Sequence, residues 1–304
     1  MKLSRREFTQ SIAAGLMSLG IAGGVADAKT PMGKPLFLIS LGEYSLHRAI
    51  GSRKLDHLHF AKTCKTDYDI DAAEYWNMPF KDKVGDQKYL ADMKKRAADA
   101  GVRSLLILID GEGNMGDPDP AGRQRAVKNH FRWVEAARFL GCKSIRVNAH
   151  SRGTPDEQLK LVADGLRQLC DLARPLEIDV IVENHGGLSS DGGWVARLMK
   201  AVNLPNCGTL PDFGNFGQYD RYRGTTELMP YAKAVSAKSH EFAPNGNETH
   251  TDYLRMMKIV IDAGYHGYVG IEYEGNKLSE PAGIKATKTL LEKVRGQLAE
   301  TKAS

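Results

Sequence analysis

Residues 144–187 read SIRVNAHSRGTPDEQLKLVADGLRQLCDLARPLEIDVIVENHGG and contain one complete strand–helix–strand unit. Aliphatic and β-branched residues dominate 144–150 and 179–183, which is typical of buried strands. Between them, T-P-D-E at 154–157 is a capping box with proline at the first helical position. Apolar residues then recur at spacings of three, four and three, from Leu159 to Leu169, so one face of a helix is apolar. The stretch therefore predicts two parallel strands joined by a helix.

The same pattern recurs along the chain. Strands are predicted at 36–41, 70–75, 103–110, 144–150, 179–183, 207–212, 234–240 and 268–273, with amphipathic segments between them. Three of these helices end at a glycine just before a strand, at Gly101, Gly141 and Gly264, where glycine adopts the left-handed conformation without strain. Eight alternations without an internal linker indicate an α/β fold, a single (β/α)8 TIM barrel. An open doubly wound sheet is the alternative, although no G-x-G-x-x-G or phosphate-loop motif follows the first strand.

Composition excludes several classes of protein. The 304 residues are 42% hydrophobic and 26% charged, which is ordinary for a globular chain and unlike a disordered or collagen-like one. The net charge of +5 is spread without a basic block, so we expect no nucleic-acid partner. Four cysteines show no CxxC pair and are expected to be small apolar residues rather than metal ligands.

The first 28 residues are expected to be a signal peptide. Arg5 and Arg6 precede Phe8 in a context that resembles the twin-arginine export signal, and an apolar run at 12–25 leads to a small-x-small site at 26–28. The mature barrel would then span 29–304 and lie in the periplasm, with no membrane association after cleavage. An uncleaved N-terminal anchor is the alternative. Because phosphorylated sugars are mainly cytoplasmic, an exported enzyme is expected to meet unphosphorylated ones.

Polar residues stand at the ends of the last four predicted strands. Glu183 ends the fifth strand, Asp212 the sixth, His240 the seventh and Glu272 the eighth. In a barrel these ends lie on one face, where the chemistry of such folds is found. Three carboxylates and one imidazole form an oxygen-rich site that suits Mn²⁺, Mg²⁺, Co²⁺ or Zn²⁺.

These residues carry a resemblance to a known family. The stretches VENHGG (182–187), PDFGNF (211–216) and GYHGYVGIEYEG (264–275) resemble the xylose-isomerase-like TIM-barrel superfamily, over roughly residues 35–297. They look most like its exported members described as sugar phosphate isomerase/epimerase. The superfamily includes sugar isomerases, ketose 3-epimerases, inosose dehydratases and family-2 apurinic endonucleases.

The resemblance implies roles for the strand-end residues. Glu183, Asp212, His240 and Glu272 would hold a divalent metal ion, and the two glutamates would also act as acid and base. The chain departs from the family at two places. Asn215 stands where many relatives have histidine. Matching Lys238 to the family's strand-seven lysine places Ser236 where the histidine ligand belongs, which leaves His240 as the imidazole of that strand.

Alternate residues of a strand point to the same side of the sheet. Several other side chains are therefore expected to point to the same side as the polar residues at the strand ends. The expected substrate-binding residues are Glu74, Trp76, Asn148, His150, His185 and Lys238. Lys238 could also stabilise an oxyanion. Core packing is equally open for Trp76, and a loop-capping role for His185. Arg146 is expected in an ion pair of a lower barrel layer, and Glu274 at the mouth or paired with a cationic side chain.

The expected function is metal-dependent isomerisation or epimerisation of an unphosphorylated sugar or keto-sugar, through deprotonation next to a carbonyl. One alternative is a lyase that cleaves 3-keto-glycosides by β-elimination after the same first step. A non-catalytic carbohydrate-binding barrel is a third reading, disfavoured by the presence of both Glu183 and Glu272. The endonuclease branch needs a trinuclear zinc cluster, which the nine histidines do not provide. The expected partner is a small carbohydrate, and a homo-oligomer is compatible with the sequence.

Overall fold

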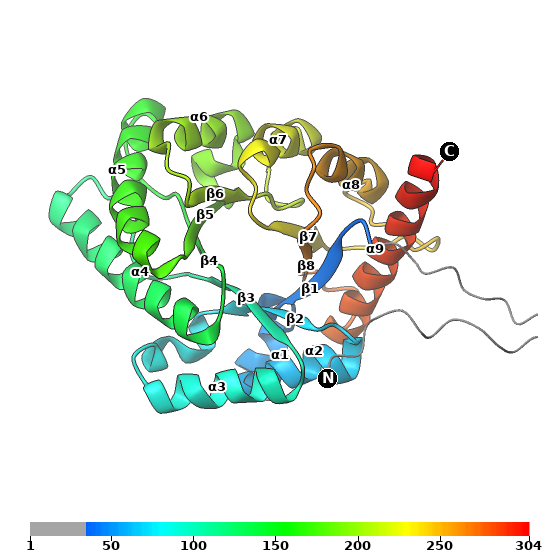
Figure 1. Cartoon of the computed structure of the whole chain (residues 1–304). Coiled ribbons are helices and arrows are strands. Elements are labelled where there is room, and N and C mark those ends of the chain that lie inside the picture. Colours follow the sequence, from blue (N-terminus) through cyan, green and yellow to red (C-terminus); the bar gives the residue numbers. More distant parts are fainter. Residues whose placement is uncertain (1–34, 304) are drawn as a thin grey trace, which may run out of the picture. The chain divides into compact units, whose positions relative to one another are not determined.

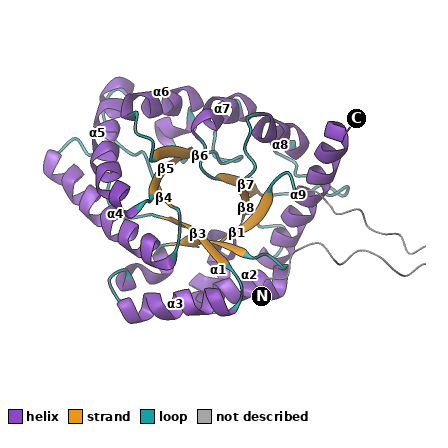
Figure 2. Cartoon of the chain, viewed as in Figure 1, coloured by secondary structure: helices purple, strands orange, loops and turns teal. Residues whose placement is uncertain are grey.

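The computed structural model describes residues 35–303, so the predicted signal peptide at 1–28 lies outside the described residues. Eight strands form one parallel sheet in the order β6-β5-β4-β3-β2-β1-β8-β7 (Figure 2). The strands are β1 (Leu38–Gly42), β2 (Ala72–Trp76), β3 (Arg103–Leu108), β4 (Ser144–Val147), β5 (Asp179–Glu183), β6 (Cys207–Leu210), β7 (Val235–Ser239) and β8 (Tyr268–Tyr273). All eight predicted strands are present, and four of them end before the polar residues that follow.

The two outermost strands, β6 and β7, are joined by isolated parallel bridges. Thr209 pairs with Ala232, and Asp212 pairs with Ser236. The backbone N–H of Ser236 donates to the Pro211 carbonyl at 2.9 Å. These bridges curl the sheet back on itself, so the chain is a (β/α)8 barrel and the open-sheet alternative does not hold.

Helices surround the strands on the outside of the barrel (Figure 1). They are α1 (His47–Gly51), α2 (Phe60–Tyr68), α3 (Gln87–Asp99), α4 (Pro120–Leu140), α5 (Pro155–Ala173), α6 (Gly192–Val202), α7 (Arg221–Leu228), α8 (Tyr253–Asp262) and α9 (Glu280–Ala303). Within residues 35–303, none of these helices is both long and apolar enough to cross a bilayer.

The predicted helix signals are confirmed. The Thr154 side chain and that of Glu157 form the complete capping box at the start of α5. Gly101, Gly141 and Gly264 have φ of +68°, +86° and +81°, which is the left-handed conformation expected after α3, α4 and α8.

Two apolar regions hold the barrel. The larger one packs helices against the outer face of the sheet, with Trp133 among its fully buried side chains. The smaller one consists of Leu106, Leu108, Ile181, Leu210 and Ala234. Ile181 and Leu210 each precede an acidic strand-end residue by two positions and share its facing. The smaller region is therefore an apolar floor beneath those acids.

Candidate active site

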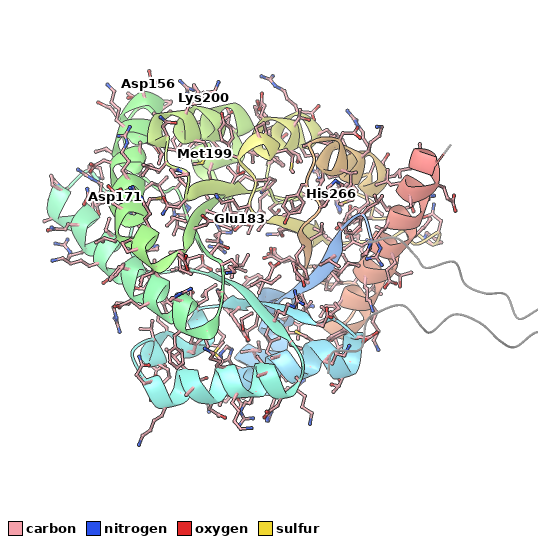
Figure 3. The ribbon with its side chains drawn as sticks, viewed as in Figure 1. Asp156, Asp171, Glu183, Met199, Lys200 and His266 are labelled. Atoms are coloured by element: carbon pink, nitrogen blue, oxygen red, sulfur yellow. The ribbon has the colours of Figure 1, made fainter. Side chains whose placement is uncertain are left out.

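Three carboxylates converge inside the barrel. Glu183 ends β5, Asp212 follows β6 and Glu272 lies in β8. One carboxylate oxygen from each lies within 4.8 Å of the other two, and all three side chains are buried. We call Glu183, Asp212 and Glu272 the carboxylate cluster. Figure 3 shows Glu183 on the inner side of the strand ring, whereas Asp156 and Lys200 belong to the surrounding helices.

Ser236 of β7 bridges two members of the carboxylate cluster. Its Oγ lies 2.7 Å from Oδ2 of Asp212 and 3.0 Å from Oε2 of Glu272. A hydroxyl has one proton and can donate to only one of these oxygens at a time. The second short contact therefore calls for a shared proton or a cation between the two carboxylates.

Lys238, two residues further along β7, is the cation of the site. Its side chain is 2% exposed, and its Nζ lies 3.0 Å from Glu274, 3.7 Å from Glu272 and 3.8 Å from Asp212. Nζ also donates to Oδ1 of Asn215 at 3.2 Å. Burial opposes the charge on Lys238, but the surrounding carboxylates outweigh it and raise the pKa well above its usual value. The expected pairing of Glu274 with a cationic side chain is observed.

Arg146 of β4 holds Glu183 from the other side. Its Nε lies 2.8 Å from Oε2 of Glu183, without hydrogen-bond geometry, and its Nη1 donates to Asp110 at 2.8 Å. Asp110 also accepts from Trp76 Nε1 and Asn148 Nδ2, both at 2.9 Å. This is the buried ion pair expected for Arg146. The sequence reasoning missed Asp110, although its position at the end of the predicted strand 103–110 was a signal.

Burial determines the proton affinities of the carboxylate cluster. Burial above the apolar floor raises the pKa of Glu183 to about 8, although the positive charge of Arg146 acts to lower it. It also raises the pKa of Asp212 to about 7, against the opposing effect of Lys238. Near neutral pH these two groups can therefore both hold and release protons, as acid–base catalysis requires.

His240 is not part of the carboxylate cluster. It follows β7 and groups instead with Glu248 and His250, whose potential ligand atoms lie within 4.8 Å of one another. The residue that does reach the carboxylate cluster from β7 is Ser236. The structure thus brings three of the four predicted ligands together and places the fourth elsewhere at the barrel mouth.

The predicted sugar-binding residues of β4 and β5 lie at the mouth. Asn148 belongs to the network around Asp110 and also accepts from Arg146 at 3.3 Å. His150 is exposed, and its Nε2 lies 3.3 Å from the carbonyl oxygen of His185. Burial and nearby cations lower the pKa of His185 to about 4, and its buried Nδ1 has no hydrogen-bond partner in the described chain.

The two candidates from β2 have different surroundings. Glu74 is buried, accepts from Ser40 Oγ at 2.6 Å and lines a cavity with residues from the starts of the strands, such as Arg103 and Tyr268. The structure therefore does not bring Glu74 to the carboxylate cluster, because its carboxylate faces the cavity at the opposite end of the barrel. Trp76 is half-buried and packs against the smaller apolar region, as the core-packing alternative expects, and Tyr44 packs edge-on against it with ring centroids 4.9 Å apart.

The donor set of the carboxylate cluster fits a divalent cation. Glu183, Asp212 and Glu272 supply oxygen atoms close enough to share one ion, and Ser236 adds a hydroxyl. Among residues 35–303, Glu183 Oε2 is buried beside Arg146 Nε and accepts no hydrogen bond. A set of oxygen ligands is typical of hard ions such as Mg²⁺ or Mn²⁺.

The fold and the cluster define a class: a (β/α)8 barrel with acidic residues at the carboxyl ends of its strands. Comparison of the sequence with models of protein families gives a match over residues 63–294 to the family described as xylose isomerase-like TIM barrel. The chain belongs to this family. Comparison with curated proteins gave no match.

Solved structures of similar fold include several enzymes of carbohydrate chemistry. The IolI protein with bound zinc has 15% identity and a TM-score of 0.69, over 86% of this chain and 99% of that one. L-ribulose 3-epimerase has 14% identity and a TM-score of 0.68, over 88% and 98%. The 3-keto-D-glucoside 4-epimerase YcjR from E. coli has 16% identity and a TM-score of 0.65, over 78% and 94%. At these identities the likeness establishes the fold alone.

Proposed function

We propose that the protein is an enzyme that removes a proton from the carbon next to a carbonyl in an unphosphorylated keto-sugar or keto-glycoside, giving epimerisation or isomerisation. The convergence of Glu183, Asp212 and Glu272 around the Lys238 ammonium carries this proposal. Structural neighbours that epimerise L-ribulose and a 3-keto-D-glucoside support it. The non-catalytic reading is disfavoured, because a binding site needs no buried acids of raised proton affinity.

The two glutamates would exchange protons with the substrate. Glu183 is held by Arg146 and by Asn215 Nδ2, which donates to Oε1 at 3.0 Å. Glu272 accepts from Ser236 Oγ and lies 3.7 Å from Lys238 Nζ. One carboxylate would take the proton, and the other would return one from the opposite face.

Lys238 would stabilise the negative charge that develops on the substrate oxygen. A buried ammonium held in place by Glu274 and Asn215 needs no reorganisation when that charge forms. We also propose that Glu183, Asp212 and Glu272, with Ser236, hold a divalent ion, Mg²⁺ or Mn²⁺ rather than a softer metal. Such an ion would acidify the C–H bond next to the carbonyl and neutralise charge on the adjacent oxygens.

NMR of keto-sugars and 3-keto-glucosides in D₂O tests the proposed function. With protein loaded with Mg²⁺ or Mn²⁺, we expect deuterium to enter the carbon next to the carbonyl. In an epimerase that uses both glutamates, Glu183→Gln and Glu272→Gln should each still exchange one epimer, provided that metal analysis shows a bound ion. Complete loss of exchange in two fully metallated variants would contradict the two-base mechanism. No exchange by the wild-type protein with any of these substrates would contradict the function.

A lyase that acts on 3-keto-glycosides is the second candidate. After removal of the proton at C2, the C1 substituent would leave by β-elimination. A cavity beside Glu274, of about 350 Å³, offers room for such a substituent next to the site. Release of the free aglycone in the same NMR experiment would select the lyase, and deuterium exchange without release would select the epimerase.

We further propose export through the twin-arginine route, with cleavage before Lys29 and the barrel in the periplasm. The SRREF context at 4–8 supports this proposal. Replacing Arg5 and Arg6 with lysine should leave an uncleaved precursor in the cytoplasm. Export that persists in this variant would contradict the assignment. Size-exclusion chromatography with light scattering tests whether the mature barrel forms a homo-oligomer.

A further inference from the structure

A small polar pocket lies at the barrel mouth, beside the ends of β6, β7 and β8. Its volume is about 350 Å³, at the lower end of the range for small-molecule sites and suited to one sugar ring. The side chains that line it are Arg221, His240, Glu241, His250, Glu274 and Asn276, and Gly214 and Gly275 complete the wall. We call it the side pocket.

The side pocket adjoins the carboxylate cluster. Glu274 lines the pocket and also pairs with Lys238 at 3.0 Å, and Lys238 faces Asp212 and Glu272. Gly214 lies against the Lys238 stem so closely that an added Cβ would approach Cδ to 2.9 Å. A molecule that reacts at the carboxylate cluster therefore has the side pocket as immediate space for a substituent.

The charges of the side pocket are mostly neutralised by residues around it. Glu274 is paired with Lys238, and Glu241 with Lys277 at 2.6 Å. Burial lowers the pKa of His240, which favours the neutral imidazole. With both carboxylates paired, the lining offers hydrogen-bonding groups from Arg221, His240 and Asn276, which suits a hydroxyl-rich ligand.

The donors and acceptors of the side pocket match hydroxyl groups. Arg221 uses Nη1 to donate to Thr251 Oγ1 at 2.6 Å, which leaves other guanidinium N–H groups available. The His240 imidazole and the Asn276 amide can each donate and accept, as sugar hydroxyls can. His250 donates from Nδ1 to Glu248 Oε1 at 3.1 Å, which leaves its Nε2 to accept from a hydroxyl.

The loop that carries His250 is held in place by Glu248. This carboxylate is buried, and it accepts from the backbone N–H groups of His250 and Thr251 at 2.6 Å each. It also accepts weaker bonds at 3.3 Å from the backbone N–H groups of His240 and Glu241. The side pocket is therefore preformed. Glu248 also lies 3.1 Å from His250 Nδ1, so the same carboxylate orients the imidazole that lines the side pocket.

We propose that the side pocket binds the second unit of a glycoside, an uncharged sugar linked to the reacting ring, so that the substrate is a keto-disaccharide rather than a free monosaccharide. This inference rests on the proposed function for the identity of the reacting ring. It also gives His240 the role of a substrate-binding residue. The reacting ring would lie over the carboxylate cluster, with the second ring between His240 and Glu274.

Ligand-observed NMR and calorimetry test this without relying on turnover. Cellobiose should bind the wild-type protein about tenfold more tightly than methyl β-glucoside, with saturation transfer to both rings. His240→Ala and His250→Ala should each remove most of that advantage and leave the affinity for methyl β-glucoside unchanged. His59→Ala, at an exposed histidine outside the pocket, is the matched control and should change neither affinity. The ratio of kcat/KM for the 3-keto forms of the two sugars should follow the same pattern.

Three results would overturn the inference. Equal affinity for the two glucosides would show that the second ring makes no contact. Tighter binding of phenyl β-glucoside than of cellobiose would assign an aromatic group to the site. Loss of a tightly bound zinc ion in His240→Ala and His250→Ala would make these residues metal ligands. If the protein turns over 3-keto methyl β-glucoside but binds the two glucosides equally well, only the role of the side pocket is refuted. If it prefers cellobiose but turns over neither 3-keto sugar, only the proposed reaction is refuted.

Discussion

The two halves of the barrel mouth use acidic residues in opposite ways. At the ends of β1–β4, Asp110 accepts hydrogen bonds from three side chains and shares Arg146 with Glu183. At the ends of β5–β8, four carboxylates surround the single ammonium of Lys238. Asp110 is paired and holds its neighbours in position, whereas burial raises the pKa of Glu183 and of Asp212 in the second half. The first half therefore acts as a support and the second half as the reactive surface.

The largest expected effect comes from removing the charge of a glutamate in the half of the mouth formed by β5–β8. Glu183→Gln and Glu272→Gln keep the shape of the side chain but remove its ability to take a proton. We expect deuterium exchange to fall by about 10²–10⁴-fold for the direction each residue serves. The same change at the exposed Glu177, which pairs with Arg138 on the surface, should leave exchange unaltered. Full exchange in a folded Glu272→Gln variant would remove Glu272 from the chemistry.

Removing the central ammonium should destabilise the crowded half. Lys238→Met leaves buried carboxylates without their counter-charge, which typically costs about 3–5 kcal/mol of unfolding free energy. Urea unfolding at pH 7 measures this loss. Lys258→Met, which breaks the exposed Lys258–Asp262 pair, is the control and should cost about 1 kcal/mol or less. Equal losses of unfolding free energy in the two variants would mean that Lys238 stabilises the fold no more than an exposed lysine does.

The buried Glu74 should make the free energy of unfolding depend on pH. Burial raises the pKa of Glu74 to about 7 from an ordinary value near 4.5. Between these values the unfolded chain releases a proton that the native state keeps, so native stability falls as pH rises through this window. Above pH 7 the penalty reaches about 3 kcal/mol.

Glu74→Gln removes this titration and keeps an acceptor for Ser40. It should therefore stabilise the protein at pH 8 and be nearly neutral at pH 4.5, as measured by urea unfolding at both pH values. Glu177→Gln again serves as the control. A gain of the same size at both pH values would show that packing, and not ionisation, is responsible.

The smallest expected effect lies in the supporting half. Asp110→Asn leaves Arg146 with Glu183 as its only carboxylate partner, so turnover should fall about tenfold through misplacement of Glu183. The guanidinium would also act more strongly on Glu183 and lower its pKa, which moves the acidic limb of the kcat–pH profile to lower pH. Asp179→Asn, at the start of β5, is the matched control. An unshifted pH profile would make Asp110 merely structural.

Much of this site was accessible from local sequence. A strand repeats every two residues, and all strands of a (β/α)8 barrel point the same way, so residues at strand ends share one face. For that reason Glu183, Asp212 and Glu272 could be grouped before any coordinates were known. An ion pair of Arg146 and a cationic partner of Glu274 were among the expectations from the same facing, but the pairing of Arg146 with Glu183 itself was not.

The eight alternations, the helix ends and the side of the barrel on which the acids lie are all predictable from local periodicity and capping. The depth of each side chain in the barrel depends on how the strands pack together. Ser236, Lys238 and His240 point to the same side of the chain, and successive members of this series are about 6.6 Å apart along an extended strand. The stagger between neighbouring strands determines which of the three lies at the same height in the barrel as Asp212. That stagger places Ser236 against the carboxylate cluster, Lys238 above it and His240 in the side pocket.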